Sequence, residues 1–257
     1  QKLVEFWEAV SEVDRVIALP KGISIWGAAD LYRPYHFDAV LILPNSLRTG
    51  LEMWSAGIPR RIGYSGHWRS WLLNQVLRRD RETKLEAREI RHQVHEYLEL
   101  AEFMGAPRLD ASEWVAERRL LAGAGVTRPW RVAVCPGAEF GAAKRWFPSS
   151  FAEVIRRVSV EKKVGWLLVG VAKDADAANE IESATSGCCV ENWIGRTGLR
   201  ELIELLRGCD LLLTNDTGTM HLGALLGLPV VAIFGSTEPD LTGPLGANKI
   251  VVQHRVP

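Results

Sequence analysis

The sequence predicts an α/β fold, with a doubly wound parallel sheet in its second half. From residue 131 onward, short apolar runs typical of buried strands alternate with segments whose apolar residues recur at helical spacing. The connections between these segments are short, which favours parallel strands joined by helices. Such sheets bind ligands at the carboxyl ends of their strands, so the loops that follow the strands are the first place to look for a site.

The predicted elements of the second half follow directly from these patterns. Strands are expected at residues 131–135, 164–169, 211–214, 230–234 and 250–253. Helices are expected at residues 150–158, 174–185, 199–207 and 218–226.

The first half shows the same alternation in a less regular form. Pro44 ends an apolar strand at 38–43, and Ser46 then occupies the N-cap position of a helix over 47–56. A stretch rich in glycine and proline at 123–130 predicts a boundary between two domains, residues 1–126 and 127–257. The remaining elements expected in this half are a strand at 61–64 and helices at 1–11, 85–104 and 112–122.

The composition excludes several classes of protein. The formal net charge is zero, which disfavours a nucleic-acid binder, and no apolar stretch approaches the ~18 residues that span a bilayer. The four cysteines have no ligand spacing and are expected to be reduced, buried thiols of a cytosolic protein. We therefore expect no metal site and no cofactor, although a magnesium ion held by a diphosphate would leave little trace in a sequence.

The loop after the strand at 131–135 combines glycines with adjacent cations. Gly137 and Gly141 let the backbone turn tightly and approach a ligand closely, and Lys144 and Arg145 place positive charge where a phosphate group could bind. The loop has neither the Walker ending nor the Gly-x-Gly-x-x-Gly pattern, so a nicotinamide dinucleotide is disfavoured. An ordinary surface loop is the alternative interpretation.

The loop after the strand at 211–214 holds five polar residues between positions 215 and 221. Capping of the next helix by Asp216 or Thr217 would explain one of them. Because a helix N-terminus also attracts anions, we expect the amides near Thr217 and Gly218, and the Thr217 hydroxyl, to bind a diphosphate, with His221 donating to a phosphate oxygen. Asp216 is itself an anion and should bind sugar hydroxyls or loop amides instead.

Two further loops follow predicted strands. Lys173 or Asp174 could contact a nucleoside, although both also suit the start of a helix. Ser236 and Thr237 could line the pocket, although the turn before Pro239 explains them almost equally well.

The first half contains an arginine-rich segment. All seven basic residues between positions 45 and 81 are arginines, and only Glu52 and Asp80 oppose them. Arginine binds carboxylate and phosphate groups bidentately, so the segment is either a solvated basic face or a docking surface for an acidic partner. Trp68 and Trp71 flank Arg69 and could reach a membrane interface, but core packing is their expected role.

Five segments carry a resemblance to one known family. They are Leu43-Pro-Asn-Ser-Leu-Arg48, Ala56-Gly-Ile-Pro-Arg-Arg-Ile-Gly-Tyr64, Pro136-Gly-Ala-Glu-Phe-Gly-Ala-Ala-Lys-Arg-Trp146, Asn215-Asp-Thr-Gly-Thr-Met-His221 and Pro229-Val-Val-Ala-Ile-Phe-Gly235. Together they resemble the heptosyltransferases of bacterial lipopolysaccharide core assembly, over nearly the whole chain.

The resemblance implies two facing Rossmann-like domains of glycosyltransferase-B architecture, with parallel sheets, helices on both faces and the active site in the cleft. It implies inverting transfer of heptose from ADP-heptose to the acidic inner core of a lipopolysaccharide glycolipid, by a cytoplasmic protein with possible peripheral contact at the inner membrane. Lys144 would neutralise the departing diphosphate. From the loops and the resemblance together, the expected donor-binding set is Gly137, Ala138, Glu139, Lys144, Lys173, Asp174, Asp216, Thr217, Gly218 and His221. The acceptor-binding set is Arg48, Arg60 and Arg61.

The sequence departs from the family at both ends. Family members begin with a strand and a Gly-Asp loop whose aspartate is the general base, and they continue with a Cys-rich, basic tail. Neither is present here, so we expect a fragment or a shortened member that lacks its base. Glu139 and Asp216 are the substitute candidates.

Three other functions remain open. The absent Gly-Asp loop favours a non-catalytic module that binds a sugar nucleotide or a glycan. A nucleotide-sugar epimerase has a similar architecture but requires paired carboxylates and histidines, which do not occur together here. A related heptosyltransferase with another acceptor is also compatible with the motifs, because these report the donor better than the acceptor.

Overall fold

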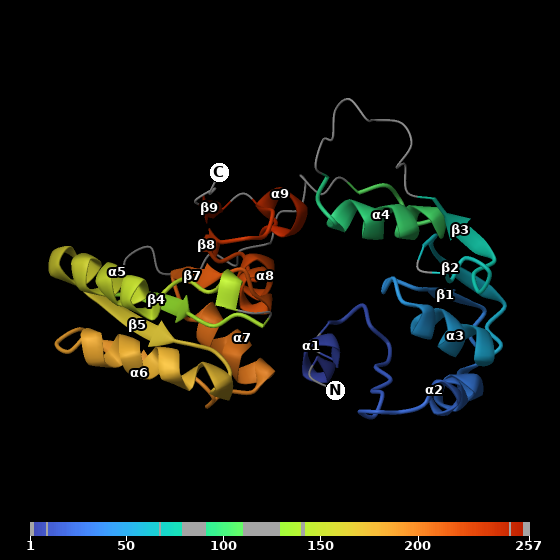
Figure 1. The fold of residues 1–257 in the computed structure, drawn as a ribbon, viewed down its shortest axis with the longest axis horizontal. Helices are drawn as coiled ribbons and strands as arrows, with labels where there is room; N and C mark the ends of the chain where they lie inside the picture. The colour runs from blue at the N-terminus through green and yellow to red at the C-terminus, as the bar shows by residue number, and fades with distance from the viewer. Residues whose placement is uncertain are drawn as a thin grey trace. The chain divides into compact units, whose positions relative to one another are not determined.

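The computed structural model describes residues 3–8, 10–66, 68–78, 91–109, 129–139, 142–246 and 248–253. The chain divides into two compact units, residues 1–109 (unit 1) and 110–257 (unit 2). Each unit contains a parallel sheet, as predicted (Figure 1). The boundary predicted between residues 126 and 127 lies outside the described residues.

Unit 1 is built on a three-stranded sheet with the strand order β1-β2-β3. All its pairs are parallel, and Ala39 of β1 pairs with Arg60 of β2. Its strands are β1 (Ala39–Leu41), β2 (Arg60–Tyr64) and β3 (Gln75–Leu77). Its helices are α1 (Val4–Glu8), α2 (Ile25–Tyr32), the short η1 (Arg33–Tyr35), α3 (Leu47–Ser55) and α4 (Val94–Phe103).

The cap predicted for α3 is confirmed. The Ser46 hydroxyl accepts a hydrogen bond from the Thr49 N–H at 3.2 Å, which satisfies a first-turn amide. The helix expected at 85–104 begins only at Val94, and its residues 85–90 lie outside the described part of the chain, as does the whole helix expected at 112–122.

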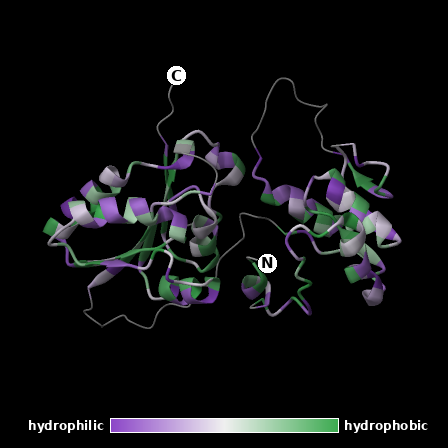
Figure 2. Cartoon of the chain, turned by 60° about the horizontal axis from the view of Figure 1, so that its bottom comes forward, coloured by the Kyte–Doolittle hydropathy of each residue, from purple (hydrophilic) through white to green (hydrophobic). Residues whose placement is uncertain are grey.

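Unit 2 contains a six-stranded parallel sheet with the order β6-β5-β4-β7-β8-β9. The five strands predicted for this half are all present, and β6 is an addition. The strands are β4 (Trp130–Cys135), β5 (Val164–Leu168), β6 (Val190–Asn192), β7 (Leu211–Asn215), β8 (Val230–Phe234) and β9 (Lys249–Gln253). They include the most hydrophobic segments of the unit (Figure 2).

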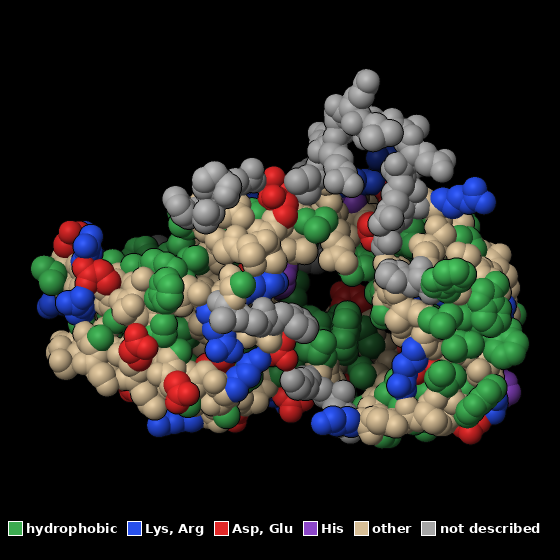
Figure 3. Space-filling view, viewed as in Figure 1, with side chains coloured by type: hydrophobic (Ala, Val, Ile, Leu, Met, Phe, Trp, Pro, Cys, Tyr) green, Lys and Arg blue, Asp and Glu red, His purple; other side chains and the backbone are tan. Residues whose placement is uncertain are grey.

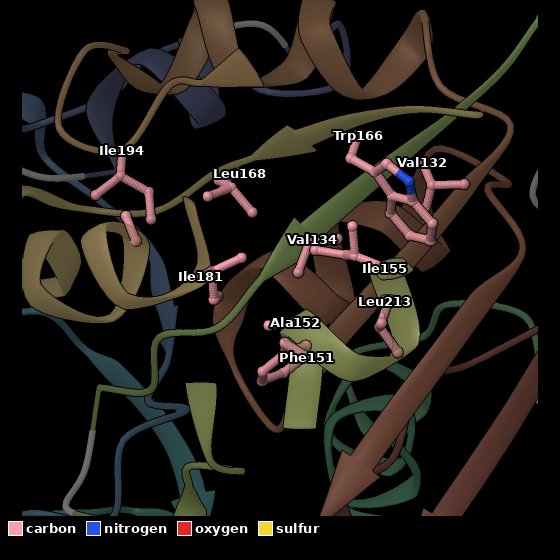
Figure 4. Packing of buried hydrophobic residues seen from close by; sticks show 11 residues of the cluster. Val132, Val134, Phe151, Ala152, Ile155, Trp166, Leu168, Ile181, Ile194 and Leu213 are labelled. Atoms are coloured by element: carbon pink, nitrogen blue, oxygen red, sulfur yellow. The ribbon is translucent and has the colours of Figure 1, made fainter. Parts of the chain in front are cut away.

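Helices cover both faces of this sheet. The helices are η3 (Ala142–Lys144), α5 (Pro148–Glu161), η4 (Ala172–Asp174), α6 (Ala175–Ala184), α7 (Leu199–Arg207), α8 (Gly218–Leu225) and α9 (Pro239–Thr242). On one face, Phe151 and Ile155 of α5 and Ile181 of α6 pack against Val134 of β4 and the neighbouring strands (Figure 4). On the other face, Gly223 lets α8 approach the Leu212 side chain of β7 closely.

The strand order places a topological switch point between β4 and β7. From β4 the chain runs outward to β5 and β6, and then returns to the other side of β4 to form β7, β8 and β9. The loops after β4 and β7 therefore diverge from adjacent strands, and Cys135 pairs with Thr214 at their carboxyl ends. A crevice opens at such a point in α/β sheets, which makes it the expected ligand site.

Candidate functional site

Asn215 joins the two loops at the switch point. Its side-chain amide donates to the Pro136 carbonyl at 2.7 Å, and its side-chain oxygen accepts from the Trp146 N–H at 3.1 Å. The residue is fully buried. Because both ends of the amide are used, Asn215 fixes the loop 136–146 against the end of β7. Sequence reasoning counted it only as one of several polar residues and missed this role.

Lys144 and Asp216 meet at the same place. The Lys144 ammonium lies 2.6 Å from the Asp216 carboxylate, which also accepts from the Thr237 hydroxyl at 2.8 Å. Asp216 is 8% exposed, whereas the Lys144 side chain is 24% exposed. Three loops, after β4, β7 and β8, thus converge on one carboxylate. The cation predicted to face a diphosphate lies at the edge of this cluster.

The N-terminus of α8 points into this group of loops. Thr217 is its N-cap, and its hydroxyl oxygen accepts from the Thr219 and Met220 N–H groups at 3.1 and 3.4 Å. A Cβ added to Gly218 would meet nothing within 4 Å, so open space lies beside the first turn. His221 is exposed in the same helix. The capping alternative is therefore correct for the Thr217 oxygen, while its proton can still be donated.

Asp174 packs against the loop that contains Gly137. It is 6% exposed, and its Oδ2 accepts from the Val171 N–H at 3.2 Å. A Cβ on Gly137 would lie 2.3 Å from that same oxygen, so only glycine fits against this carboxylate. These contacts give Asp174 a supporting position within the protein, whereas Lys173 beside it is exposed.

Two further ion pairs brace the loops at this edge of the sheet. Arg145 donates to the carbonyl of the buried Ala138 at 3.2 Å, and its guanidinium lies 3.7 Å from Asp174. Lys173 and Glu139 form a more exposed pair at 2.8 Å between the loops after β5 and β4. Arg145 was expected to face a phosphate, but its contacts with Ala138 and Asp174 stabilise the loop instead. Lys144 is the cation that lies beside Asp216.

The arginines of unit 1 do not form one surface. Arg69 is fully buried and donates to the carbonyls of Pro44 and Tyr64 and to the Asn45 side chain. The prediction that it belongs to a solvated face or a docking surface is wrong, because these buried oxygens need a donor. Arg79 and Arg81 lie outside the described residues.

The three predicted acceptor-binding arginines differ in their accessibility. Arg61 is half-buried and donates to the carbonyls of Leu72 and Ile58. Arg48 binds Glu52 at 2.7 Å while 53% of its side chain stays exposed. Arg60 is exposed. Arg48 and Arg60 can therefore contact an acidic ligand, and Arg61 already serves the fold.

Two expectations about apolar side chains are wrong. Trp68 and Trp71 are not in the core, because they are 91% and 66% exposed. Cys189 is also exposed, whereas Cys135 and Cys209 are buried free thiols. Burial raises the pKa of Cys135, against hydrogen bonds from nearby threonines that lower it.

Within the described ranges, no group of three or more His, Cys, Asp or Glu residues could hold a metal ion. Within the same ranges, every helix falls short of the length and apolar character needed to cross a bilayer.

Comparison with known proteins identifies the family. Residues 31–257 match the model of glycosyltransferase family 9 (heptosyltransferase). The chain is 32% identical to lipopolysaccharide heptosyltransferase 2 of Escherichia coli (strain K12) over 94% of its own length and 74% of that protein. The structure of E. coli ADP-heptose lps heptosyltransferase II superposes with a TM-score of 0.75 at 29% identity, over 97% of this chain and 78% of the other.

A third comparison concerns the fold alone. The structure of the E. coli heptosyltransferase WaaC with ADP has a TM-score of 0.74 at 19% identity, and covers 99% of this chain and 82% of that one.

The two units with parallel sheets and helices, matched by the structure of the E. coli heptosyltransferase II over nearly the whole chain, give the fold of a glycosyltransferase of the glycosyltransferase-B class. The chain belongs to glycosyltransferase family 9, the heptosyltransferases.

Proposed function

We propose that this protein transfers heptose from ADP-heptose to the inner core of lipopolysaccharide, with inversion at the sugar carbon. The observation that carries the proposal is the position of Lys144, which lies beside the N-terminus of α8 at the switch point of unit 2. The names of the relatives support the sugar and the acceptor: one is a lipopolysaccharide heptosyltransferase 2, and a solved structure at 29% identity is named an ADP-heptose lps heptosyltransferase II.

Unit 2 binds the donor in this proposal. The Gly218 amide, the dipole of α8 and the Thr217 hydroxyl hold the diphosphate, and the open space beside Gly218 gives it room. The loop containing Gly137, Ala138 and Glu139, and Lys173 of the next loop, lie toward the nucleoside. Asp174 acts by supporting this loop.

Lys144 stabilises the leaving group. The bond between the sugar carbon and a diphosphate oxygen breaks, the acceptor oxygen bonds to the opposite face of that carbon, and the acceptor proton passes to a general base. Negative charge grows on the departing diphosphate, and a cation held in place before the reaction lowers the barrier without needing to reorganise. Asp216 binds a sugar hydroxyl and keeps Lys144 at the site. His221 donates to a phosphate oxygen.

The two substitute candidates for the general base are already engaged. Asp216 accepts from Lys144 and Thr237, and Glu139 pairs with Lys173. A base must be free to accept the acceptor proton, so neither carboxylate is assigned this role.

The acceptor is proposed to be an acidic glycolipid at the cytoplasmic face of the inner membrane, approached by peripheral contact. Arg48 and Arg60 are accessible in unit 1 and suit its phosphate and carboxylate groups. Arg61 positions the strand from which Arg60 projects.

The first test is a calorimetric titration of the chain with ADP, UDP and GDP. We expect selective binding of ADP that weakens about tenfold or more in Lys144→Ala, because a charge-assisted contact to the diphosphate is lost. Lys163→Ala is the matched control. This exposed lysine directly precedes β5 and so lies at the amino ends of the strands, whereas the site lies at their carboxyl ends. Equal binding by Lys144→Ala and the wild type would overturn the donor-site assignment.

A turnover assay with ADP-heptose and a lipopolysaccharide acceptor separates the transferase from a non-catalytic module. A module would bind ADP and form no product, whereas the proposed enzyme releases ADP only when the acceptor is present.

A further inference from the structure

The surface of unit 1 carries tryptophans that its own fold leaves uncovered. Trp68 is 91% exposed and Trp71 66% exposed, and both lie in the loop between β2 and β3. Hydrophobic side chains gather on the right-hand face of this unit in Figure 3. Isolated exposed apolar residues are common, but contiguous aromatic patches mark interaction sites.

The loop is anchored firmly beneath these side chains. Arg69 and Leu72 are fully buried and Leu73 is 5% exposed, between and after the two tryptophans. Arg69 ties the loop to the Pro44 and Tyr64 carbonyls. The segment therefore directs its leucines and Arg69 inward and its tryptophans outward. For the arginine and the tryptophans this is the reverse of what folding alone favours.

Trp68 also has an unfavourable backbone conformation. Its φ is 58°, in the left-handed region that bulky residues rarely adopt. Such conformations persist where the surrounding structure enforces them, and they are concentrated at functional positions. The conformation and the exposure of Trp68 thus indicate the same thing, that this side chain is presented for contact.

Helix α3 extends the exposed apolar surface. Trp54 is 47% exposed, and its ring lies edge-on to Trp71 with centroids 6.4 Å apart. Leu47, two turns earlier on the same side of α3, is 40% exposed. These four residues, Trp54, Trp68, Trp71 and Leu47, form what we call the tryptophan patch.

The exposed charges of the segment that carries the tryptophan patch have one sign. Within residues 45–66 and 68–78 the only acidic residue is Glu52, which is 4% exposed and paired with Arg48. Arg48 follows Leu47 directly and stays half exposed, and Arg60 and Arg78 are exposed. The nearby helix α2 adds one exposed carboxylate, Asp30, but it is paired with Arg33, which also donates to the Ser55 carbonyl beside Trp54. The net charge of this exposed surface is therefore positive, which complements an anionic surface.

We infer that the tryptophan patch docks this protein on an anionic lipid bilayer. Tryptophan prefers the boundary between headgroups and acyl chains, because its ring is apolar and its N–H is polar. Neighbouring arginines add attraction to anionic headgroups. The inference rests on the proposed function in one respect, because a membrane glycolipid acceptor gives the docking its purpose.

The test is co-sedimentation of the chain with vesicles of phosphatidylethanolamine and phosphatidylglycerol. The double variant Trp68→Ala/Trp71→Ala should lower the partition coefficient by about tenfold or more, because most of the buried apolar area is removed. Binding of the wild type should weaken in vesicles of pure phosphatidylcholine. It should also weaken between about 0.1 and 1 M salt, since the screening length shrinks from ~10 to ~3 Å.

Trp130→Ala is the matched control, because Trp130 is 60% exposed at the start of β4 in unit 2. This variant should bind vesicles as the wild type does. The inference is overturned if the wild type does not bind vesicles, if the double variant binds equally well, or if Trp130→Ala loses as much binding. Self-association of the wild type that the double variant abolishes, without vesicle binding, would assign the tryptophan patch to a second copy and would also overturn it.

The same proteins are titrated with ADP to separate this inference from the proposed function. Unchanged ADP affinity in the double variant, together with lost vesicle binding, supports the docking surface. Absence of ADP binding by the wild type would count against the donor site alone and leave the vesicle result standing.

Discussion

Lys144 and Asp216 form an ion pair of 2.6 Å across the switch point of the unit 2 sheet, although 72 positions separate them in the sequence. The pair places a carboxylate next to the cation that is proposed to bind a diphosphate. Asp216 therefore has two opposing effects: it orients Lys144, and its charge repels an incoming anion. The two effects can be distinguished because a neutral amide oxygen can still accept a hydrogen bond from Lys144 but does not repel an anion.

Replacing Asp216 by Asn should separate them. The variant keeps the shape and removes the charge, so ADP should bind about two- to tenfold more tightly. The proposed contact with a sugar hydroxyl is weakened at the same time, so the preference for ADP-heptose over ADP should fall. Calorimetric titration with both ligands measures the two affinities. A loss of ADP affinity as large as in Lys144→Ala would mean that the orienting effect dominates.

Substitutions of two glycines should affect stability and binding in opposite ways. In Gly137→Ala the new Cβ meets Asp174 at 2.3 Å, so the free energy of unfolding of unit 2 should fall by about 1–3 kcal/mol. In Gly218→Ala the Cβ meets nothing within 4 Å, so stability should change by less than about 0.5 kcal/mol. If the diphosphate occupies that space, ADP affinity should nevertheless fall about tenfold.

Urea unfolding and ADP titration of both variants check this prediction. The two glycines are controls for each other, because each variant adds a single methyl group to a loop of the same site. Full ADP affinity in a stable Gly218→Ala protein would show that the diphosphate does not bind at the N-terminus of α8.

The sequence predicted the elements whose stabilising contacts are local or highly apolar. β4, β5, β7, β8 and β9 are runs of mostly apolar residues, and each was expected. β3 and β6 were missed because each has three residues, includes polar side chains and lies at the edge of its sheet. An edge strand pairs on one side only and needs less apolar surface, so its pattern is weak.

The site was predicted in part. The motif loops identified the residues at the switch point, because strand-to-helix loops of a parallel sheet converge there. The contacts between these residues were not predictable. The hydrogen bonds of Asn215 and the packing of Asp174 against Gly137 join loops that are far apart in the sequence. Trp68 was misassigned because its apolar character favours burial, whereas the buried Arg69 beside it fixes the loop in the opposite orientation.

In unit 1, the hydrogen bond between Tyr64 and Glu99 should make stability depend on pH. The Tyr64 hydroxyl donates to Glu99 at 2.5 Å. Burial raises the pKa of Glu99, but the hydrogen bonds from Tyr64 and Arg91 outweigh it and leave the pKa below its usual value. The stabilisation is therefore complete above the unfolded-state pKa, about 4.3, and is lost as the pH falls through the lower folded-state pKa.

Tyr64→Phe should lower the free energy of unfolding by about 1 kcal/mol at neutral pH, less than is usual for a bond to a charged group, because 38% of the Glu99 side chain is exposed. The difference from the wild type should shrink between pH 7 and about pH 3, because the stabilisation is lost as the carboxyl group takes up a proton. Urea titrations at both pH values measure it. Tyr97→Phe is the control, because Tyr97 is an exposed tyrosine of α4, the helix that also carries Glu99. An equal loss at both pH values would assign the effect to packing.

Cys135 should report ligand binding through its reactivity. Its sulfur lies 4.0 Å from the Thr217 hydroxyl, directly below the proposed diphosphate site, and burial raises its pKa. Only the thiolate reacts with iodoacetamide, so at about pH 8 Cys135 should be alkylated at least about tenfold more slowly than the exposed Cys189.

ADP should slow the alkylation of Cys135 further, because a ligand that binds only the closed site suppresses the opening that exposes the thiol. Peptide mass spectrometry follows each cysteine separately, and Cys189 is an internal control that ADP should leave unchanged. Rapid alkylation of Cys135 in the folded protein would contradict its burial. Equal alkylation of Cys135 with and without ADP, or protection of both cysteines by ADP, would contradict this placement of the ligand above Thr217.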